Sequence, residues 1–231
     1  MFCYVKGSKL VALSNQLIGE SSQLQKQTSK VAQDVLRMGA LVEESFRYCH
    51  KALFEGELEA VSIIKAQDRE IDRYYREIEI HCASILTLQA PVAQDLRILS
   101  AFMQLVRDLE RIGDYAEDLG EIALKLALYT PHPCMAELAI MSQQAQIMLA
   151  KTMVALSELD SEAGAKIKLL DDTVDYAYER LYKTLAYQRD IKGVVEPIVL
   201  LALAIRHLER MADHATNIAQ RVSYIVTGRR N

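Results

Sequence analysis

Hydrophobic residues recur at steps of three and four through most of the chain, and this spacing predicts amphipathic helices joined by short turns. Two of the predicted helices carry the clearest hydrophobic seams. One seam consists of Leu105, Leu109, Ile112, Ala116, Leu119, Ala123 and Leu126. The other consists of Leu208, Met211, Ala215, Ile218, Val222 and Ile225. Because the seams share one phase, the pattern predicts two equivalent helices that face a core in the same way.

Turn-forming residues divide this pattern into helices. Gly56 interrupts the first helix, and Ala90-Pro91 ends the second, because the residue before a proline disfavours the helical conformation. Thr130-Pro131-His132-Pro133 is the strongest break in the chain. The predicted helices cover about residues 23–54, 57–88, 93–129, 135–159 and 165–189, and a sixth has Pro197 in its first turn and ends at Thr227-Gly228.

A sequence repeat relates the two halves of the chain. Residues 108–118 match residues 207–217 through the shared pattern Leu-Glu-Arg-[Ile/Met]-x-Asp. The second and fifth helices share the pattern Asp-x2-[Ile/Val]-Asp-x2-Tyr, which begins at Asp68 and at Asp171. Three helices with short loops fold as an up-and-down bundle. We therefore predict an all-α fold of two tandem, similar three-helix bundles.

The break at Thr130 places the first predicted repeat in residues 1–130 and the second in residues 131–231. The first repeat includes an atypical N-terminal segment, residues 1–22, whose secondary structure the sequence leaves ambiguous. A short helix is nevertheless compatible with the apolar residues Val11, Leu13, Leu17 and Ile18.

Acidic residues occupy equivalent positions off the two hydrophobic seams. On the two motif helices, these positions hold Glu110, Asp114 and Asp118, and Glu209, Asp213 and Asn217. The second and fifth helices add Asp68 and Asp72, and Asp171 and Asp175, which flank the core seam. Carboxylates four residues apart on a helix repel each other by roughly a few tenths of a kcal/mol. We call these two sets of off-seam positions the acidic stripes. Because both halves keep this unfavourable arrangement, we interpret the stripes as binding surfaces with a shared role outside the core.

Clustered carboxylates suit hard or borderline cations, which include Mg²⁺, Ca²⁺ and Mn²⁺ and, with suitable geometry, Fe or Zn. His207 and His214 lie beside the stripes, either as additional ligands or as ordinary half-exposed histidines. The other interpretation of the stripes is a solvated face of intrahelical ion pairs, which would add little stability. The arginines that could form these pairs are Arg107, Arg111, Arg206 and Arg210.

Composition narrows the class of protein. With 231 residues, nine Gly and four Pro, the chain is long enough for a sizeable core and poor in turns. A net charge of −4 gives no support for direct nucleic-acid binding. We find neither a signal peptide nor an apolar run of membrane-spanning length, and therefore expect a soluble, cytoplasmic protein. The four cysteines are scattered without a Cys-x2-Cys pair and are expected to be reduced.

Catalytic signatures are absent from the sequence. It contains no Glu-x2-His motif of the kind that di-iron bundles use, no phosphate-binding P-loop and no Gly-x-Ser-x-Gly nucleophile motif. We therefore predict that the protein is not an enzyme. A metal-binding helical-bundle enzyme or a metal store is the alternative interpretation of the stripes.

In its acidic repeat motifs and in several other segments, the chain resembles the PhoU family of bacterial phosphate-signalling regulators. The resemblance extends from about residue 24 to the C-terminus. It is carried by the segments 38–44 (MGALVEE), 89–97 (QAPVAQDLR), 108–114 (DLERIGD), 208–219 (LERMADHATNIA) and 224–228 (YIVTG). The segment 1–22 does not match the usual start of the family, and the loop before the sixth helix lacks the motif of residues 90–97.

The resemblance implies a fold of two three-helix bundles. In some members of the family, the acidic motifs of these bundles bind metal clusters. Carried over by position, the metal candidates are Glu110, Asp114, Asp118, Glu209, Asp213, Asn217, Asp68, Asp72, Asp171 and Asp175. Because Asn217 stands where the first repeat has Asp118, the second site should bind cations more weakly. The metal would be Fe, Zn, Mn or Mg.

The resemblance also implies partners. PhoU-like proteins act as adaptors between a phosphate ABC transporter, through its ATPase subunit, and a membrane sensor histidine kinase. When phosphate is plentiful they hold the kinase inhibited and restrain phosphate uptake. We therefore expect a negative regulator of the phosphate-starvation response that is a homodimer and reaches the membrane only through its partners.

Overall fold

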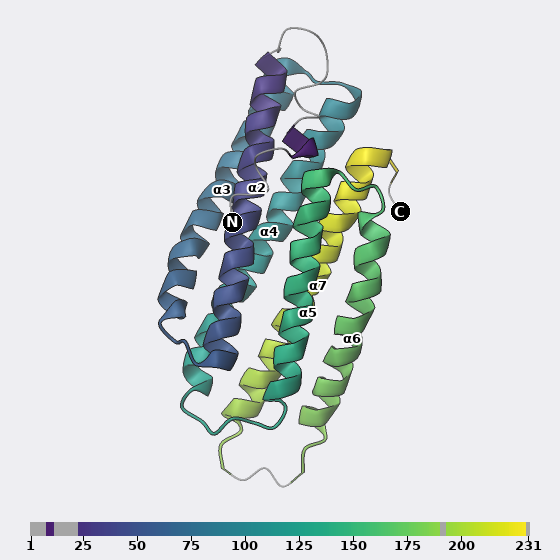
Figure 1. Cartoon of the computed structure of the whole chain (residues 1–231). Helices are drawn as coiled ribbons and strands as arrows, with labels where there is room; N and C mark the ends of the chain where they lie inside the picture. The colour runs from purple at the N-terminus through teal and green to yellow at the C-terminus, as the bar shows by residue number, and fades with distance from the viewer. Residues whose placement is uncertain (1–7, 12–22, 190–192, 230–231) are drawn as a thin grey trace.

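The structure is a computed structural model that describes residues 8–11, 23–189 and 193–229. Within these residues it consists of helices joined by turns and loops and contains no strand, in agreement with the predicted all-α fold class. The helices are α2 (Gln23–His50), α3 (Ala60–Gln89), α4 (Ala93–Leu126), α5 (Met135–Glu158), α6 (Ala163–Ala186) and α7 (Glu196–Thr227), and the π-helical turn η1 (Lys51–Glu55) continues α2. Helices α2–α4 form one bundle and α5–α7 form the other, as Figure 1 shows.

The helix ends follow the turn residues that the sequence places there. Gly56 follows η1 with a φ of 76°, and Gly228 follows α7 with a φ of 73°, a left-handed conformation that glycine adopts without steric cost. Helix α3 ends at Gln89, two residues before Pro91. The observed ends of the helices differ from the predicted ones by a few residues, as expected where a terminal turn frays.

The N-terminal segment contributes one buried residue to the core. Residues 9–11 are helical, and Leu10 is 2% exposed. The hydroxyl of Ser8 donates a hydrogen bond to the Ser157 carbonyl over 2.9 Å, which attaches this segment to α5. The rest of the predicted short helix, with Leu13, Leu17 and Ile18, lies outside the described residues.

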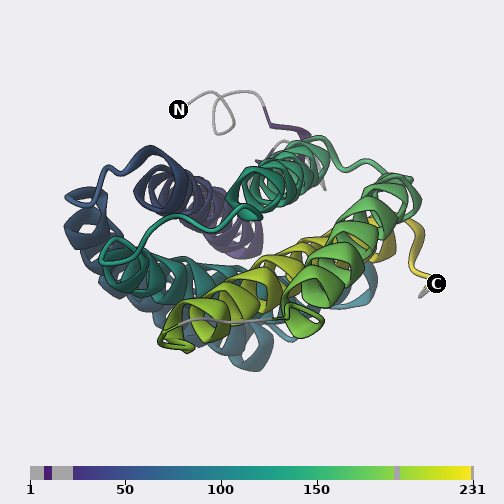
Figure 2. The ribbon, with the colours of Figure 1, turned by 90° about the horizontal axis from the view of Figure 1, so that it is seen from below.

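The two bundles pack side by side in two layers. Seen end-on, α4 and α7 lie next to each other in one layer, α3 and α6 lie at its outer edges, and α2 and α5 form the other layer (Figure 2). Between the bundles, α4 packs along α7 and α2 packs on α5. Gly39 permits the second of these contacts, because the Met153 side chain occupies the space that a Cβ atom at position 39 would take.

The hydrophobic core follows the predicted seams. In α7 every seam residue is buried, and in α4 only Leu126 at the end of the helix is partly exposed. The equivalent leucines of the two repeats, Leu109 and Leu208, are both 0% exposed. Hydrophobic periodicity therefore predicted which face of each motif helix is buried.

Helices α4 and α7 run antiparallel, and a polar network joins them. The Nδ1 atom of His214 lies 2.8 Å from Asp108 Oδ1, and an Arg221 nitrogen lies 3.3 Å from Asp108 Oδ2. Seven residues further along α4, the ring of Tyr115 lies 5.2 Å from that of His207, which is seven residues earlier in α7. Positions 108 and 207 correspond in the repeat, as do 115 and 214, so the interface has approximate twofold symmetry.

None of the described helices combines the length with the apolar character that a membrane crossing requires.

Candidate functional site

The first carboxylate cluster lies between α3 and α4. We define it as Asp68 and Asp72 of α3 with Glu110, Asp114 and Glu117 of α4, because each of them interacts with a carboxylate of the other helix so as to raise a pKa. The cluster forms because the two helices pack antiparallel with their acidic positions facing each other. Stripes from two separate helices therefore make one group of like charges.

Burial and mutual repulsion both disfavour ionisation in this first cluster. Desolvation, followed by repulsion from neighbouring carboxylates, raises the pKa of Asp68 and that of Asp114 to about 6. The pKa of Glu110 is raised as well, mainly by desolvation. Groups of carboxylates with raised pKa values are typical of sites that bind cations or exchange protons.

Asp118, at the end of the first stripe, raises the pKa of Asp114 and also lies close to α7. Asp118 has a side chain that is 55% exposed, and its Oδ2 atom lies 3.9 Å from His207 Nε2 of α7. Glu117, which the sequence analysis did not single out, instead raises the pKa of Asp68 across the α3–α4 contact. The i,i+3 spacing of Asp114 and Glu117 is the sequence signal that could have found it.

The second carboxylate cluster lies between α6 and α7. It consists of Asp171 and Asp175 of α6 with Glu209 and Asp213 of α7. Desolvation, then repulsion within the cluster, raises the pKa of Asp175 and that of Glu209. The remaining metal candidate of the second repeat, Asn217, is half-buried on α7.

A lysine distinguishes the second cluster from the first. Lys168 Nζ lies 2.8 Å from Asp171 Oδ2, and the Asp171 side chain is only 3% exposed. The other oxygen, Asp171 Oδ1, is buried without a hydrogen-bond partner. An ammonium group therefore already supplies positive charge to this cluster, and a metal ion would compete with it.

The stripes lie outside the core, as predicted, but they are less exposed than a solvated face. The side chains of Glu110 and Glu209 are 17% and 13% exposed, because they face the neighbouring helix of the same bundle. The expected intrahelical ion pairs are also present at the rim. They join Arg111 to Asp114 at 3.2 Å, Arg206 to Glu209 at 2.7 Å and Arg210 to Asp213 at 2.9 Å.

The two histidines do not join the carboxylate clusters. His214 bonds Asp108 in the α4–α7 contact, and His207 is 3.9 Å from Asp118, so both face away from α3 and α6. His214 is 8% exposed, and is therefore more buried than the half-exposed helix histidine that the sequence suggested.

The donor chemistry of the clusters fits a hard cation, because carboxylate oxygens at raised pKa gain most from added positive charge. Their arrangement does not yet form a coordination shell. In the part of the chain that the structure describes, no three His, Cys, Asp or Glu side chains converge as they would around one ion. Metal binding at either cluster therefore stays a prediction that involves side-chain movement.

The raised pKa of Asp68 predicts a pH-dependent stability. Its ordinary pKa is 3.8 and its folded pKa is about 6, so between these values the folded state binds more protons than the unfolded state. Stability should therefore fall as pH rises through this window. Asp68→Asn should stabilise the protein at pH 7.5 by about 1 kcal/mol, allowing for solvent screening, and by less at pH 4.5.

Urea denaturation of wild type and variant at both pH values measures this effect. Glu179→Gln is the matched control, because Glu179 is 60% exposed and pairs only with Lys183. A larger gain for Asp68→Asn at pH 4.5 than at pH 7.5 would contradict the predicted sign.

Comparison with known proteins adds independent findings. Two stretches of the chain, residues 35–123 and 138–222, match the family model described as PhoU domain. A relative from Synechocystis sp., called phosphate-specific transport system accessory protein PhoU homolog, is 68% identical over 220 residues, which cover 95% of this chain and 98% of the relative.

Two crystal structures are similar to the present one. That of PhoU from Pseudomonas aeruginosa gives a TM-score of 0.86 at 30% identity and covers 90% of this chain and 100% of its own. That of the phosphate transport system regulatory protein PhoU from Streptococcus pneumoniae gives 0.82 at 28% identity and covers 90% and 99%.

Proposed function

The chain belongs to the PhoU family, and we propose that it is an accessory protein of a phosphate-specific transport system. The observation that carries this proposal is the similarity to the Synechocystis protein, which spans nearly all of both chains. The two family matches also fall on the two bundles, α2–α4 and α5–α7. The relatives are called accessory or regulatory proteins, which agrees with the prediction that this chain is not an enzyme.

Within that role, the proposed activity is regulation by binding. The protein would connect the ATPase subunit of a phosphate transporter to a membrane sensor histidine kinase. With phosphate abundant, it would keep the kinase inhibited and limit phosphate uptake. The family resemblance supports this part of the proposal, and the partly buried acidic clusters offer a charged surface that a basic partner surface would complement.

Deletion of the gene tests the proposed function. The expected result is expression of phosphate-starvation genes and elevated phosphate uptake in phosphate-rich medium, with both restored by the intact gene. A deletion strain that represses these genes normally in rich medium would overturn the regulatory role. Co-purification of the transporter ATPase subunit and of the kinase with the tagged protein tests the adaptor role separately.

The outer side of α5 supports the expected homodimer. Ile140, Ile147 and Val154 follow one another at seven-residue spacing on this helix, and they are 56%, 50% and 36% exposed. Helix α5 is thus apolar on its outer side as well as toward the core, a property of helices that are covered on both sides. We propose that a second copy of the chain covers this stripe.

Sedimentation equilibrium of Ile147→Lys tests the dimer contact. The variant should be monomeric at concentrations where the wild type dimerises, because a lysine ammonium would be desolvated in the contact. Leu169→Lys is the control, since Leu169 is 71% exposed on α6. A dimer that is unchanged in Ile147→Lys would place the contact elsewhere.

The first carboxylate cluster is the proposed metal site of this protein. Asp68, Asp72, Glu110, Asp114 and Glu117 would supply oxygen ligands, and bound positive charge would relieve their repulsion. The second cluster is expected to bind more weakly, because Lys168 already neutralises part of its charge. The metal candidates are still Fe, Zn, Mn and Mg.

Elemental mass spectrometry of protein purified without chelator tests this prediction by measuring the metal content per chain. Glu110→Gln/Asp114→Asn should lower the metal content per chain several-fold after reconstitution with each candidate metal. Glu179→Gln is the control, since Glu179 is a 60% exposed carboxylate of α6 that pairs with Lys183, and its metal content should equal that of the wild type. Equal metal content in all three proteins, or none in any, would remove the site from this cluster.

A further inference from the structure

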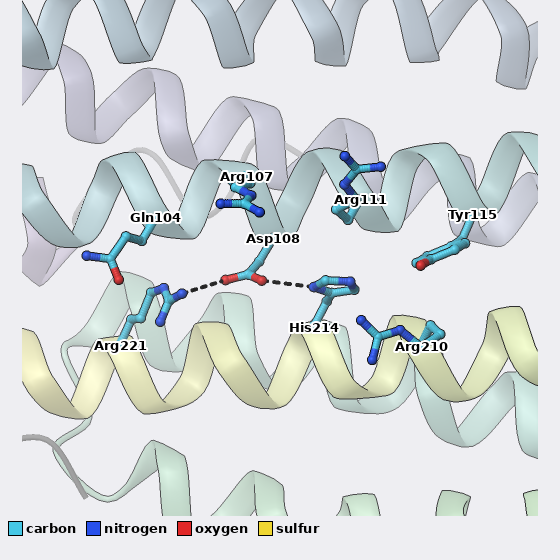
Figure 3. Close-up of a pocket in the computed structure, with 8 residues that line it drawn as sticks. All are labelled: Gln104, Arg107, Asp108, Arg111, Tyr115, Arg210, His214 and Arg221. Carbon is cyan, nitrogen blue, oxygen red and sulfur yellow. Dashed lines mark hydrogen bonds and ion pairs between the residues drawn. The ribbon is translucent and has the colours of Figure 1, made fainter.

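A pocket of about 660 Å³ lies between α4 and α7 and adjoins the first carboxylate cluster at Arg111. Its lining includes Arg107 and Arg111 from α4 and Arg210 and Arg221 from α7. Asp108 and His214 lie between these arginines, and the dashed lines of Figure 3 show Asp108 joined to Arg221 and to His214. The two repeats thus build this pocket together.

Arginines dominate the lining of the pocket. Four guanidinium groups line it, and among the described residues Asp108 is its single lining carboxylate. Arg111 and Arg210 are anchored at the rim by pairs with Asp114 and Asp213 of their own helices. Arg107 is exposed and forms no ion pair within 8–11, 23–189 and 193–229, although its charge lowers the pKa of Glu110, so its guanidinium hydrogen bonds can be donated to a ligand. A concave surface with this excess of positive charge concentrates anions.

The floor of the pocket has unmet hydrogen-bonding capacity. His214 is 8% exposed, and its Nε2 atom has no hydrogen-bond partner among the described residues. In the same part of the chain, Arg221 Nε is buried without a partner, and Asp108 Oδ2, although it is ion-paired with Arg221, accepts no hydrogen bond. Buried polar groups are normally paired, since leaving them unpaired is unfavourable. These atoms therefore point to a polar ligand that would supply their missing hydrogen bonds.

The combination of groups identifies the class of ligand. A guanidinium group can donate two parallel hydrogen bonds to two oxygens of a phosphate group, because its N–H groups are spaced to match them. A buried carboxylate beside them repels a fully deprotonated anion such as sulfate, but accepts a hydrogen bond from a P–OH group. We propose that this pocket binds a phosphate group that carries a proton, either as inorganic phosphate or as the phosphate of a small organic ester.

The proposal goes beyond the proposed function, because an accessory protein of a transporter could receive its signal entirely from its partners. It would give this chain a phosphate site of its own at the contact between the two repeats. The volume lies in the range of small-molecule pockets, which leaves room for a group attached to the phosphate.

Isothermal titration calorimetry with the purified full chain tests the site. The probes are inorganic phosphate, pyrophosphate, ADP and sulfate, each at constant ionic strength. We expect at least one of the phosphorus compounds to bind, and sulfate to bind about tenfold more weakly or not at all. Binding of inorganic phosphate identifies the free ion as the ligand, and binding of ADP alone identifies an organic phosphate. No heat with any probe at millimolar concentration would overturn the proposal.

Two variants separate the pocket from general surface charge. Arg107→Gln should weaken binding about tenfold, and it should fold normally because Arg107 has an exposed side chain without an ion pair in the described chain. Arg206→Gln is the matched control, since Arg206 is the equivalent residue of the second repeat and does not line the pocket. Equal weakening in both variants would overturn the site, since it would show attraction by net charge alone.

Asp108→Asn tests the selectivity separately. The amide keeps the size of the side chain but removes the negative charge, so sulfate should bind this variant about as well as phosphate. Circular dichroism confirms that the variant is folded before the titration. Unchanged preference for phosphate over sulfate in a folded Asp108→Asn would overturn the role of Asp108.

Discussion

Asp108→Ala is expected to destabilise the protein by about 3 kcal/mol, through the loss of the buried network between α4 and α7. Asp108 is 7% exposed and bonds His214 over 2.8 Å, while it pairs with Arg221 over 3.3 Å. Alanine would leave a buried imidazole N–H and a partly buried guanidinium without their acceptor. The loss of a buried partner costs more than the net contribution of the pair, because the remaining groups stay desolvated.

Chemical denaturation at neutral pH measures this effect. Asp118→Ala is the matched control, because Asp118 is an aspartate of the same helix that also faces a histidine of α7 but has a side chain that is 55% exposed. Its loss of stability should stay below about 0.5 kcal/mol, as for other exposed pairs. A change below about 1 kcal/mol for Asp108→Ala would show that the two bundles do not depend on this network.

Leu208→Ala is expected to cost about 3 kcal/mol, within the range of about 2–5 kcal/mol for leucine truncations in cores. Leu208 is 0% exposed and belongs to the seam of α7, a helix that contacts both α4 and the rest of its own bundle. Removal of its methyl groups loses hydrophobic burial and leaves a cavity that long, packed helices cannot readily close.

Leu203→Ala provides the comparison on the same helix, since Leu203 is 45% exposed. This substitution should cost less than about 1 kcal/mol, because little apolar surface returns to water. Thermal and urea unfolding of the two variants should rank them in this order. Similar losses for both would mean that the seam does not determine the stability of α7.

Helix α4 carries different charged groups toward its two neighbours, α3 and α7. Toward α3 the helix presents Glu110 and Asp114, and toward α7 it presents Arg107 and Asp108 in the arginine-lined pocket. The two proposed sites therefore adjoin each other on one helix, and Arg111, which lines the pocket and pairs with Asp114, connects them.

The sequence by itself determined the helices, the repeat and the core. Periodicity of three and four selects one face of a helix whatever lies opposite, so the seams through Leu109 and Leu208 were predictable from local spacing. The breaks at Gly56 and Gly228 were predictable for the same local reason, since their backbone conformation suits glycine. The equivalent placement of the acidic stripes followed from the repeat.

Only the tertiary structure decided what each polar position faces. Glu117 and Asp118 are adjacent in sequence, yet Glu117 acts on Asp68 of α3 while Asp118 lies near His207 of α7. Adjacent helix positions point about 100° apart, and the outcome depends on which helices pack on either side. The antiparallel pairing of α4 with α7, which brings Asp108 to His214 across 106 positions of sequence, is a property of long-range packing that local spacing does not encode.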